Sequence, residues 1–475
     1  MLLRYFYDEK LAHASYLVGC QRTGEAIVVD PGRNIDEYLR VVEREKMQIT
    51  AVTETHIHAD FVSGARELAD RTGARLYLSD EGDANWKYQY LDGYDHVLLK
   101  DGDTWKVGNI EFKALHTPGH TPEHMSFMIT DTAGASKPMG VFTGDFVFVG
   151  DVGRPDLLES AAGFAGTKEV GARQLFQSLQ KFRELPDYLQ LWPAHGAGSA
   201  CGKALGAVPT TTLGYEKMFN WAFSIEEEDK FVEAVLEGQK DPPVYFAEMK
   251  RINKEGPAVL RGFPVLPRLE VNRLAEIIDA GGWVIDTRAR AEASISHIPG
   301  TVNIPLTRSF TTYCGWVLPY DQPLYLIIAE DRIEEAVEAL IRIGYDNVKG
   351  FFTPETVATW PEFTGKAFSV IEQQTPEMAA ELITSGSVPV IDVRTRQEFE
   401  AGHPVNATNI PLAQIGRNGH STIDADRVVL SCQSGGRSFV AASMLQRAGV
   451  QAQLINLDGG YEAWTGAGLP IEKQG

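Results

Sequence analysis

The sequence predicts an α/β protein built from three domains. Two observations support this class: the first half alternates short apolar runs with helical patterns, and the second half contains one segment twice. A chain of 475 residues is also too long for one compact core, since a domain takes roughly 150 residues. We therefore expect layers of sheet and helix in successive domains.

Apolar runs and helical patterns alternate along the first half of the chain. The runs "EAIVVDPG", "ARLYLSD", "PMGVFTGD" and "YLQLWPAH" predict strands, and residues 61–71 and 171–183 have helical periodicity. The pattern then changes to a polar helical stretch, "SIEEEDKFVEAVLEGQK", followed by "DPPVYF", where paired prolines indicate the end of a helix. These changes predict a first domain over residues 1–250, with a boundary between Tyr245 and Pro264.

An internal repeat occupies the second half. The segment "VIDTRARAEASISHIPGTVNIPL" from Val284 aligns with "VIDVRTRQEFEAGHPVNATNIPL" from Val390, at an offset of 106 residues and with 11 of 23 positions identical. The period is too long for a solenoid, so we expect two tandem copies of one domain, over residues 260–368 and 370–475. The runs "PLYLII" and "RVVLS" are apolar enough to predict strands buried in parallel sheets.

Composition and charge exclude several classes of partner. Lys and Arg total 44 against 64 Asp and Glu, and the net charge of −20 disfavours nucleic acid and anionic membranes. The N-terminal residues lack the apolar core of a signal peptide or membrane span, and the four cysteines form no CxxC motif or close pair. We expect a cytoplasmic protein with free thiols, and the sequence leaves open whether it forms a homo-oligomer.

Potential metal ligands cluster in four short motifs of the first domain. "THIHADFVSG" sets His56, His58 and Asp60 at alternate positions, and Phe61 follows. Farther along, "TPGHT", "FTGD" and "PAHG" contain the remaining candidates, His120, Asp145 and His195. Because imidazole and carboxylate groups bind metals and strand-end loops can bring distant ligands together, these motifs predict a metal site.

The four motifs, in this order, resemble the metallo-β-lactamase superfamily over essentially the whole first domain. The resemblance implies a four-layered αββα sandwich with metals at one edge. A two-metal hydrolase of this superfamily would use Asp60, a histidine at position 61 and His195 to build its second site. Phe61 cannot coordinate a metal, so this departure favours a single ion.

Within the superfamily, the sequence resembles the persulfide dioxygenases, which bind iron through the residues that match His56, His120 and Asp145. Two histidines and one carboxylate suit non-haem Fe(II) and leave positions for substrate and O2. The resemblance therefore implies one Fe(II) per chain. Three further residues would then orient the ligands or the substrate without binding iron: His58, Asp60 and His195.

Cys201 lies six residues after His195, in "PAHGAGSACGK". Two glycines and Lys203 indicate an accessible loop that stabilises a thiolate, and the alternative is a small buried thiol. The sequence here resembles dioxygenases fused to sulfurtransferase domains. That resemblance implies that Cys201 takes part in sulfur chemistry near the iron.

Cys432 lies in "SCQSGGRS", between an apolar strand and an apparent helix. Successive backbone N–H groups and a helix N-terminus can hold a thiolate or persulfide anion, and Arg437 adds positive charge. With "DVR", "NIPL" and "DGGYEAW", this loop resembles the rhodanese family of sulfurtransferases throughout the last domain. The resemblance implies catalysis by Cys432 and Arg437, and the alternative is a non-catalytic rhodanese-like module. The residues expected to surround the persulfide are Gln433, Ser434, Gly435 and Gly436.

The earlier copy lacks this cysteine loop. It keeps "VIDTR" and "NIPL" but reads "LIIAEDRIEEAVEAL" where the loop belongs, with Ile327 or Ile328 near the place of the cysteine. Glu330 and Asp331 would repel a persulfide anion. We expect a degenerate rhodanese-like domain that acts as a spacer or docking surface.

Together these features predict Fe(II)-dependent oxidation of a low-molecular-weight persulfide by O2 to sulfite and thiol, coupled to sulfane-sulfur transfer through Cys432 that gives thiosulfate. The expected partners are therefore small molecules: persulfide, O2, and sulfite or thiosulfate. One alternative is a two-metal thioester hydrolase of the glyoxalase II kind, against which Phe61 argues. A second alternative is a non-enzymatic sulfur-relay protein that carries a persulfide on Cys432.

Overall fold

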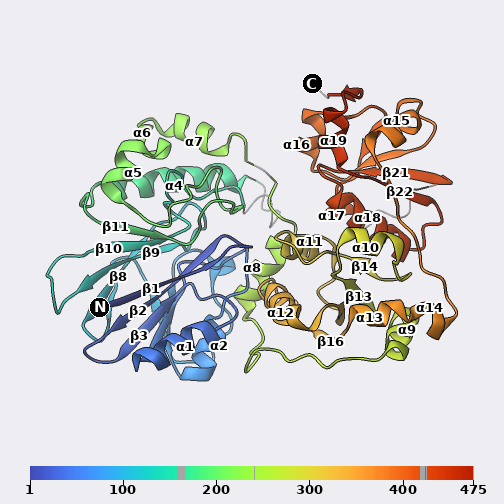
Figure 1. Ribbon diagram of the computed structural model, residues 1–475. Coiled ribbons are helices and arrows are strands. Elements are labelled where there is room, and N and C mark those ends of the chain that lie inside the picture. Colours follow the sequence, from blue (N-terminus) through green and yellow to red (C-terminus); the bar gives the residue numbers. More distant parts are fainter. Residues whose placement is uncertain (158–165, 240, 418–422, 424, 474–475) are drawn as a thin grey trace. The chain divides into compact units, whose positions relative to one another are not determined.

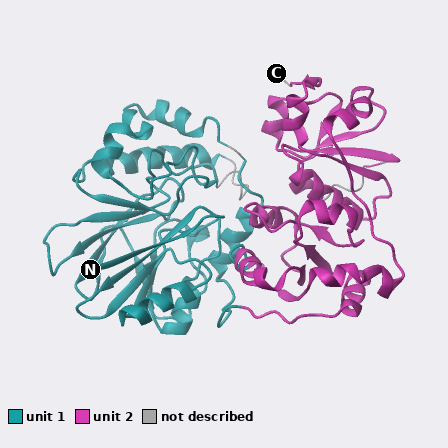
Figure 2. Cartoon of the chain, in the orientation of Figure 1, with its two compact units in different colours: residues 1–263, 341–344 teal, residues 264–340, 345–475 magenta. Residues whose placement is uncertain are grey.

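The computed structural model describes residues 1–157, 166–239, 241–417, 423 and 425–473. It divides into two compact units, residues 1–263 with 341–344 and residues 264–340 with 345–475 (Figure 2). The predicted end of the last domain, at residue 475, lies outside the described residues. Within the described ranges, no helix is both long and apolar enough to cross a membrane.

Two six-stranded sheets form the centre of the first unit (Figure 1). The strands of the first sheet are, in spatial order, β1 (Leu2–Asp8), β2 (His13–Cys20), β3 (Glu25–Val29), β4 (Gln48–Thr53), β5 (Arg75–Ser79) and β6 (His96–Leu99). Those of the second are β12 (Thr211–Thr212), β11 (Gln190–Pro193), β10 (Gly140–Gly144), β9 (Met125–Asp131), β8 (Ile110–His116) and β7 (Thr104–Val107). Both sheets are mixed: β3 to β6 are parallel, and so are β10 and β11.

The two sheets pack face to face, and helices cover their outer faces. Strand β3 illustrates the arrangement, because Ile27 and Val29 join the core between the sheets, whereas Ala26 and Val28 join the core under the helices. Successive side chains of a strand point to opposite faces, so a strand covered on both sides is apolar throughout. This architecture confirms the expected αββα sandwich.

Helices of the first unit belong to two outer layers. Residues of α1 (Asp36–Glu45) and α2 (Ala65–Thr72) pack on the first sheet. Residues of four helices pack on the second sheet: α4 (Thr167–Arg183), α5 (Leu213–Phe219), α6 (Trp221–Ser224) and α7 (Glu228–Leu236). The unit also contains the short η1 (Ala84–Trp86) and α8 (Phe246–Glu255).

The second unit contains two parallel sheets, as the apolar runs predicted. The first, with the helices around it, forms what we call the middle repeat, and its strands are β14 (Val302–Asn303), β13 (Trp283–Asp286), β15 (Leu324–Ile327) and β16 (Val348–Phe352). The second forms the terminal repeat, with strands β17 (Glu372–Gln374), β22 (Gln453–Leu457), β21 (Arg427–Ser431), β18 (Val390–Asp392) and β20 (Ala407–Asn409). A short antiparallel pair, β19 (His403–Pro404) and β23 (Ile471–Glu472), completes the terminal repeat.

Helices alternate with strands along both repeats. Those of the middle repeat are α9 (Val271–Asp279), α10 (Arg290–Ile295), α11 (Phe310–Val317), η2 (Glu330–Arg332), α12 (Ile333–Ile341), α13 (Pro354–Ala358) and α14 (Trp360–Thr364). Those of the terminal repeat are α15 (Pro376–Thr384), α16 (Arg396–Ala401), α17 (Leu412–Arg417), α18 (Gly436–Arg447) and α19 (Gly460–Gly466).

Candidate metal centre and cysteine loop

The predicted metal ligands lie in loops at the ends of strands. His56 follows β4, His120 lies between β8 and β9, Asp145 follows β10, and His195 follows β11. Because β10 and β11 are parallel neighbours, the loops after them start at the same edge of the sheet. The topology thus brings together residues that are far apart in the sequence.

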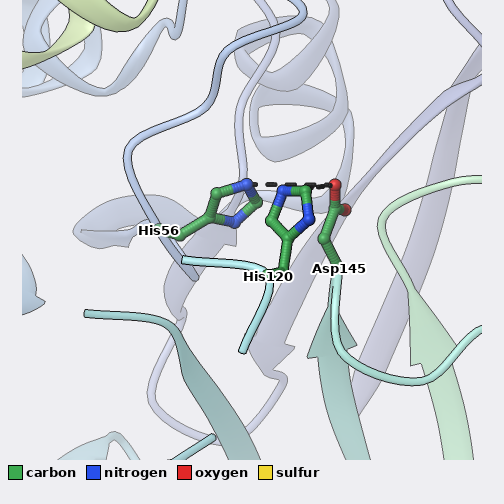
Figure 3. A group of neighbouring side chains, drawn as sticks. All are labelled: His56, His120 and Asp145. Atoms are coloured by element: carbon green, nitrogen blue, oxygen red, sulfur yellow. Dashed lines mark ion pairs between the residues drawn. The ribbon is translucent and has the colours of Figure 1, made fainter. Parts of the chain in front are cut away.

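His56, His120 and Asp145 form one compact group (Figure 3). Each offers a ligand atom within 4.8 Å of the others, and all three residues are buried. The Oδ2 atom of Asp145 lies 3.4 Å from Nε2 of His120 and 3.9 Å from Nε2 of His56. Two imidazoles and one carboxylate therefore converge on one point.

Hydrogen bonds orient the two imidazoles for coordination. Nδ1 of His120 lies 3.0 Å from the carbonyl oxygen of Arg154, and Nδ1 of His56 lies 3.0 Å from the hydroxyl of Thr55. Nε2 of His56 and both oxygens of Asp145 are buried without a hydrogen-bond partner in the described part of the chain. Buried polar atoms normally have partners, so this donor set fits a metal ion.

The protonation states of His56, His120 and Asp145 also favour metal binding. Burial lowers the pKa of His56 well below its usual value and also lowers the pKa of His120, which favours neutral imidazoles. Burial acts to raise the pKa of Asp145, but the nearby His195 and His120 outweigh it and hold the pKa below the usual value. Neutral imidazole and ionised carboxylate are the forms that coordinate metals.

A second group of ligand atoms lies beside the first. Asp60, His195 and Cys201 each offer an atom within 4.8 Å of the others, and all three are buried. Nε2 of His195 lies 3.2 Å from Oδ2 of Asp60 and 3.4 Å from Oδ1 of Asp145. No sequence motif connects Cys201 to Asp60, so Cys201 was expected only as a thiol near the metal and not as a ligand. A second ion would thus have three ligands without a histidine at position 61.

Phe61 is buried between two histidine rings. Its ring centroid lies 3.8 Å from that of His13 and 4.4 Å from that of His58. His13, on β2, is itself buried, and its Nε2 atom has no hydrogen-bond partner among the described residues. His13 could not be recognised from the sequence, because no metal-binding motif contains it. The phenyl ring thus fills apolar space beside the site.

His58 is held by a carboxylate. Its Nε2 atom lies 2.9 Å from Oδ1 of Asp30, a residue that also accepts a hydrogen bond from the backbone N–H of Thr55. Burial acts to lower the pKa of His58, but Asp30 outweighs it and raises the pKa to about 9. Asp30 therefore fixes both ends of the segment that carries His56.

Cys201 does not lie in an accessible loop, contrary to the expectation from its flanking glycines. Its side chain is buried, and the carbonyl of Cys201 accepts a hydrogen bond from the backbone N–H of Arg154. Burial, together with the charges of Asp145 and Asp60, raises the pKa of the Cys201 thiol well above its usual value. Lys203 does not offset this, because its Nζ atom binds the carbonyl oxygen of Ala234. Only a cation in the site would favour the thiolate.

In the terminal repeat, Cys432 follows β21 and precedes α18. Its Sγ atom accepts hydrogen bonds from the backbone N–H of Gly435, at 3.1 Å, and from the hydroxyl of Ser438, at 3.3 Å. Gly435 has a φ of +85°, a conformation that favours glycine, and it caps α18. The loop therefore holds the sulfur at the N-terminus of a helix, where an anion is stabilised.

Arg437 points to a carboxylate that the sequence analysis did not consider. Its guanidinium donates two hydrogen bonds to Glu398, at 2.6 and 2.7 Å. Glu398 also accepts a hydrogen bond from the backbone N–H of Thr395, as part of the capping box of α16. The positive charge of Arg437 is therefore shared with Glu398. Another loop side chain, Gln433, lies 3.4 Å from the guanidinium of Arg394.

The strand register fixes the equivalent of Cys432 in the middle repeat. Asp392 pairs with Ser431 across β18 and β21, and its counterpart Asp286 pairs with Ile327 across β13 and β15. Ile328, the next residue, therefore occupies the position of Cys432. It is buried, and no thiol is present there.

The fold and these groups define a metal-binding αββα protein joined to an α/β unit with a cysteine loop. A family model described as the Metallo-beta-lactamase superfamily matches residues 9–195, and one described as the Rhodanese-like domain matches residues 375–467. The crystal structure of a metallo-beta-lactamase from Staphylococcus aureus subsp. aureus COL is 44% identical, with a TM-score of 0.66, over 74% of this chain and 99% of that one. The chain belongs to the metallo-β-lactamase superfamily and contains a rhodanese-like domain.

Curated relatives match part of the chain. A Beta-lactamase hydrolase-like protein from Xylella fastidiosa (strain 9a5c) is 30% identical over 213 residues, which are 40% of this chain and 46% of that protein. This chain thus spans about half the length of that relative. A Hydroxyacylglutathione hydrolase from Rhodospirillum rubrum is 31% identical over 180 residues, 38% of this chain and 60% of that enzyme.

Proposed function

We propose that the chain is an Fe(II)-dependent persulfide dioxygenase with a sulfurtransferase activity. The observation that carries the first activity is the group of His56, His120 and Asp145, because two imidazoles and one carboxylate on one side of an ion suit non-haem iron. Bound iron(II) would activate O2 and accept the substrate sulfur. Overall, a persulfide, O2 and water give a thiol, sulfite and two protons.

The residues of the chain prepare this site. Thr55 and Arg154 orient His56 and His120, so that each Nε2 atom faces Asp145. Burial of all three ligands excludes bulk water from the reacting groups. The relative at 31% identity is, by its name, a hydrolase of hydroxyacylglutathione, a derivative of a small thiol. A small thiol with a second sulfur on it is a substrate of similar shape.

The second activity belongs to Cys432. Its thiolate would accept a sulfane sulfur, and the N–H of Gly435 would stabilise the charge on sulfur. Attack by sulfite on the outer sulfur of the Cys432 persulfide breaks the S–S bond, releases the thiolate and forms thiosulfate. Sulfite, the product of the first activity, would thus be consumed by the second. The middle repeat, in which Ile328 replaces the cysteine, would be a degenerate rhodanese-like domain.

One experiment tests the first activity directly. The protein is loaded anaerobically with iron, its metal content is determined, and oxygen uptake is followed after addition of persulfides of several small thiols. We expect one iron per chain and oxygen uptake that depends on persulfide. Absence of uptake with every persulfide would reject the dioxygenase proposal.

A second candidate function is a two-metal thioester hydrolase. The group of Asp60, His195 and Cys201 favours it, because these residues could hold a second ion next to Asp145. Zinc analysis and an acyl-glutathione assay discriminate between the candidates. Two zinc ions per chain, hydrolysis of the thioester and loss of one ion in a Cys201→Ala variant would support the hydrolase.

A further inference from the structure

Helix α18, which starts at the cysteine loop, is buried on every side over its middle part. Eight consecutive residues, Ser438 to Leu445, are buried. A helix that packs only on its own sheet would expose one side, so a helix buried on every side is covered by a second partner. Helix α17 of the terminal repeat provides part of this cover, and contacts along α18 show that the middle repeat provides another part.

Three contacts attach α18 and the cysteine loop before it to the middle repeat. Near the C-terminal end, the guanidinium of Arg447 donates hydrogen bonds to the carbonyls of Gly281, Gly282 and Gly300, at 2.6 to 2.9 Å. Halfway along, the hydroxyl of Ser443 accepts a hydrogen bond from the backbone N–H of Asn303.

The third contact lies at the cysteine loop itself. Arg290, the first residue of α10, forms a 2.7 Å ion pair with Asp458, and its guanidinium lies 3.4 Å from the carbonyl oxygen of Ser434. A methyl group on Gly435 would lie only 2.4 Å from Nη1 of Arg290. Arg290 therefore packs directly on the residue whose N–H holds the Cys432 sulfur.

A tyrosine of the middle repeat also reaches this loop. The hydroxyl of Tyr313, on α11, lies 3.9 Å from the point where a side chain on Gly436 would begin. The side chain of Tyr313 is partly exposed. A phenol in this position can donate a hydrogen bond to a group held at the N-terminus of α18.

We propose that the middle repeat completes the sulfurtransferase site: Arg290 positions the cysteine loop, and Tyr313 contacts the oxygen atoms of the sulfur oxyanion that reacts at Cys432. This inference rests on the proposed sulfurtransferase activity. The ligand class is a small sulfur oxyanion, such as thiosulfate or sulfite. The repeat without a cysteine is then part of an active site and not only a spacer.

The reaction used for the test is transfer of sulfur from thiosulfate to cyanide. The Cys432 thiolate attacks the outer sulfur of thiosulfate, the S–S bond of thiosulfate breaks, and sulfite leaves with the electron pair. Cyanide then attacks the outer sulfur of the Cys432 persulfide, giving thiocyanate and the thiolate. No oxidant or reductant is consumed in these two steps.

The repeat supplies a matched control for Arg290. Arg396 is the residue at the same position of the terminal repeat, and it forms an exposed ion pair with Glu400. Arg290→Ala removes the ion pair with Asp458 that holds the cysteine loop in place. The variant should therefore be alkylated at Cys432 by iodoacetamide about ten times more slowly, and kcat for thiocyanate formation should fall equally. Arg396→Ala should change neither. Alkylation is followed by mass spectrometry of the peptide that contains Cys432.

Tyr313→Phe should give a different signature. Alkylation by the neutral reagent should be unchanged, whereas KM for thiosulfate should rise about tenfold, since a hydrogen bond to an anion is removed. Sulfate, an unreactive oxyanion, should protect Cys432 of the wild type from alkylation, and protection should need about ten times more sulfate in Tyr313→Phe.

These readouts separate failure of the inference from failure of the proposed function. If the wild type forms no thiocyanate, the sulfurtransferase proposal fails. The alkylation rate of Cys432 still tests the positioning role of Arg290, and protection by sulfate still tests the anion contact of Tyr313. Equal effects of Arg290→Ala and Arg396→Ala, or unchanged KM and protection in Tyr313→Phe, would overturn the inference. Should Arg290→Ala unfold at the assay temperature, Asp458→Asn breaks the same ion pair from the other side, and normal alkylation in that variant would overturn it.

Discussion

His56, His120 and Asp145 share one property, which is that each presents a ligand atom into the same buried space. Substituting any of them by Ala should abolish iron binding and persulfide-dependent oxygen uptake, because three protein ligands leave no redundancy. Metal analysis and an oxygen electrode measure the two effects, and His96→Ala, which changes an exposed histidine, is the control. Full iron content with normal uptake in any of the three variants would show that the ligand assignment is wrong.

Substitution of Phe61 tests how many metal ions the chain binds. A Phe61→His variant adds an imidazole close to His58 and should raise the metal content above one ion per chain, without faster oxygen uptake. The substitution also puts a polar ring where a phenyl packs on His13, so a lower melting temperature should accompany it. Two tightly bound ions in the unmodified protein would refute the argument from Phe61 and assign a ligand role to Cys201.

Some of the site residues could be predicted from the sequence, and others could not. His120, Asp145 and His195 each lie in a short motif of glycine and small residues that marks a strand-end loop, so their proximity follows from the topology. Glu398 lies in no such motif, and the glycine-rich stretch around Cys201 does not indicate that its thiol lies beside Asp60. Their partners, Asp60 and Arg437, are chosen by how separate loops fold back on one another, which local patterns do not encode.

At the scale of elements, helix α8 supports the metal-binding loop from outside. The side chain of Asn253 donates hydrogen bonds to the carbonyls of His58 and Phe61 and accepts one from the N–H of Ser63. Asn253→Ala should lower metal affinity about tenfold, because such supporting hydrogen bonds hold ligands in place. Arg251→Ala, which changes only exposed ion pairs of the same helix, is the control. Equal metal affinity in both variants, measured by competition with a chelator, would exclude this role.

The sequence did not predict this helix. Residues 246–255 lie between a proline pair and a glycine, where a domain boundary was expected, and the helix crosses residue 250. Its role depends on contacts of Asn253 with residues about 190 positions earlier in the chain. Such long-range pairing cannot be deduced from periodicity, which describes only the face of a helix that is buried.

The pair of Glu398 and Arg437 connects helices α16 and α18. Burial acts to raise the pKa of Glu398, but Arg437 outweighs it and lowers the pKa to about 2, from an ordinary value of 4.5. The stabilisation is therefore complete above pH 4.5 and is lost as the pH falls from 4.5 toward 2.

Glu398→Gln should reproduce that loss at neutral pH. Glutamine still caps α16 but has no charge, so the variant should unfold at lower denaturant concentration than the wild type at neutral pH. The difference between the two proteins should shrink as the pH falls below 4.5. KM for thiosulfate should also fall in this variant, because the positive charge of Arg437 is no longer shared with Glu398. A difference in stability that stays constant with pH would contradict the ion-pair account.

At the scale of the whole molecule, the two proposed activities are assigned to different units of one chain. Cys432→Ser should abolish sulfur transfer, because serine cannot form the S–S bond that carries sulfane sulfur. Persulfide-dependent oxygen uptake should continue at a comparable initial rate, with sulfite accumulating in place of thiosulfate. A product assay that resolves sulfite from thiosulfate measures this, and an unchanged thiosulfate fraction would direct attention to Cys201.

The class of the fold could be predicted from the sequence. Alternating apolar runs predicted layered sheets, and the repeat from Val284 and Val390 predicted two related parallel sheets, because each pattern is local and recurs. The coverage of α18 by the middle repeat could not be predicted in this way. It depends on single contacts such as the hydrogen bond of Arg447 to Gly300, and such contacts leave no periodic pattern in the sequence.

The burial of α18 on every side has a consequence for how such proteins can be rearranged. A terminal repeat moved alone into another protein would expose the surface of α18 that now lies against Asn303 and would lose the partners of Arg447. Deletion of the middle repeat should therefore be more harmful than its missing cysteine suggests. An engineered protein that borrows the terminal repeat should therefore take the middle repeat with it, because each covers a surface that the other would expose.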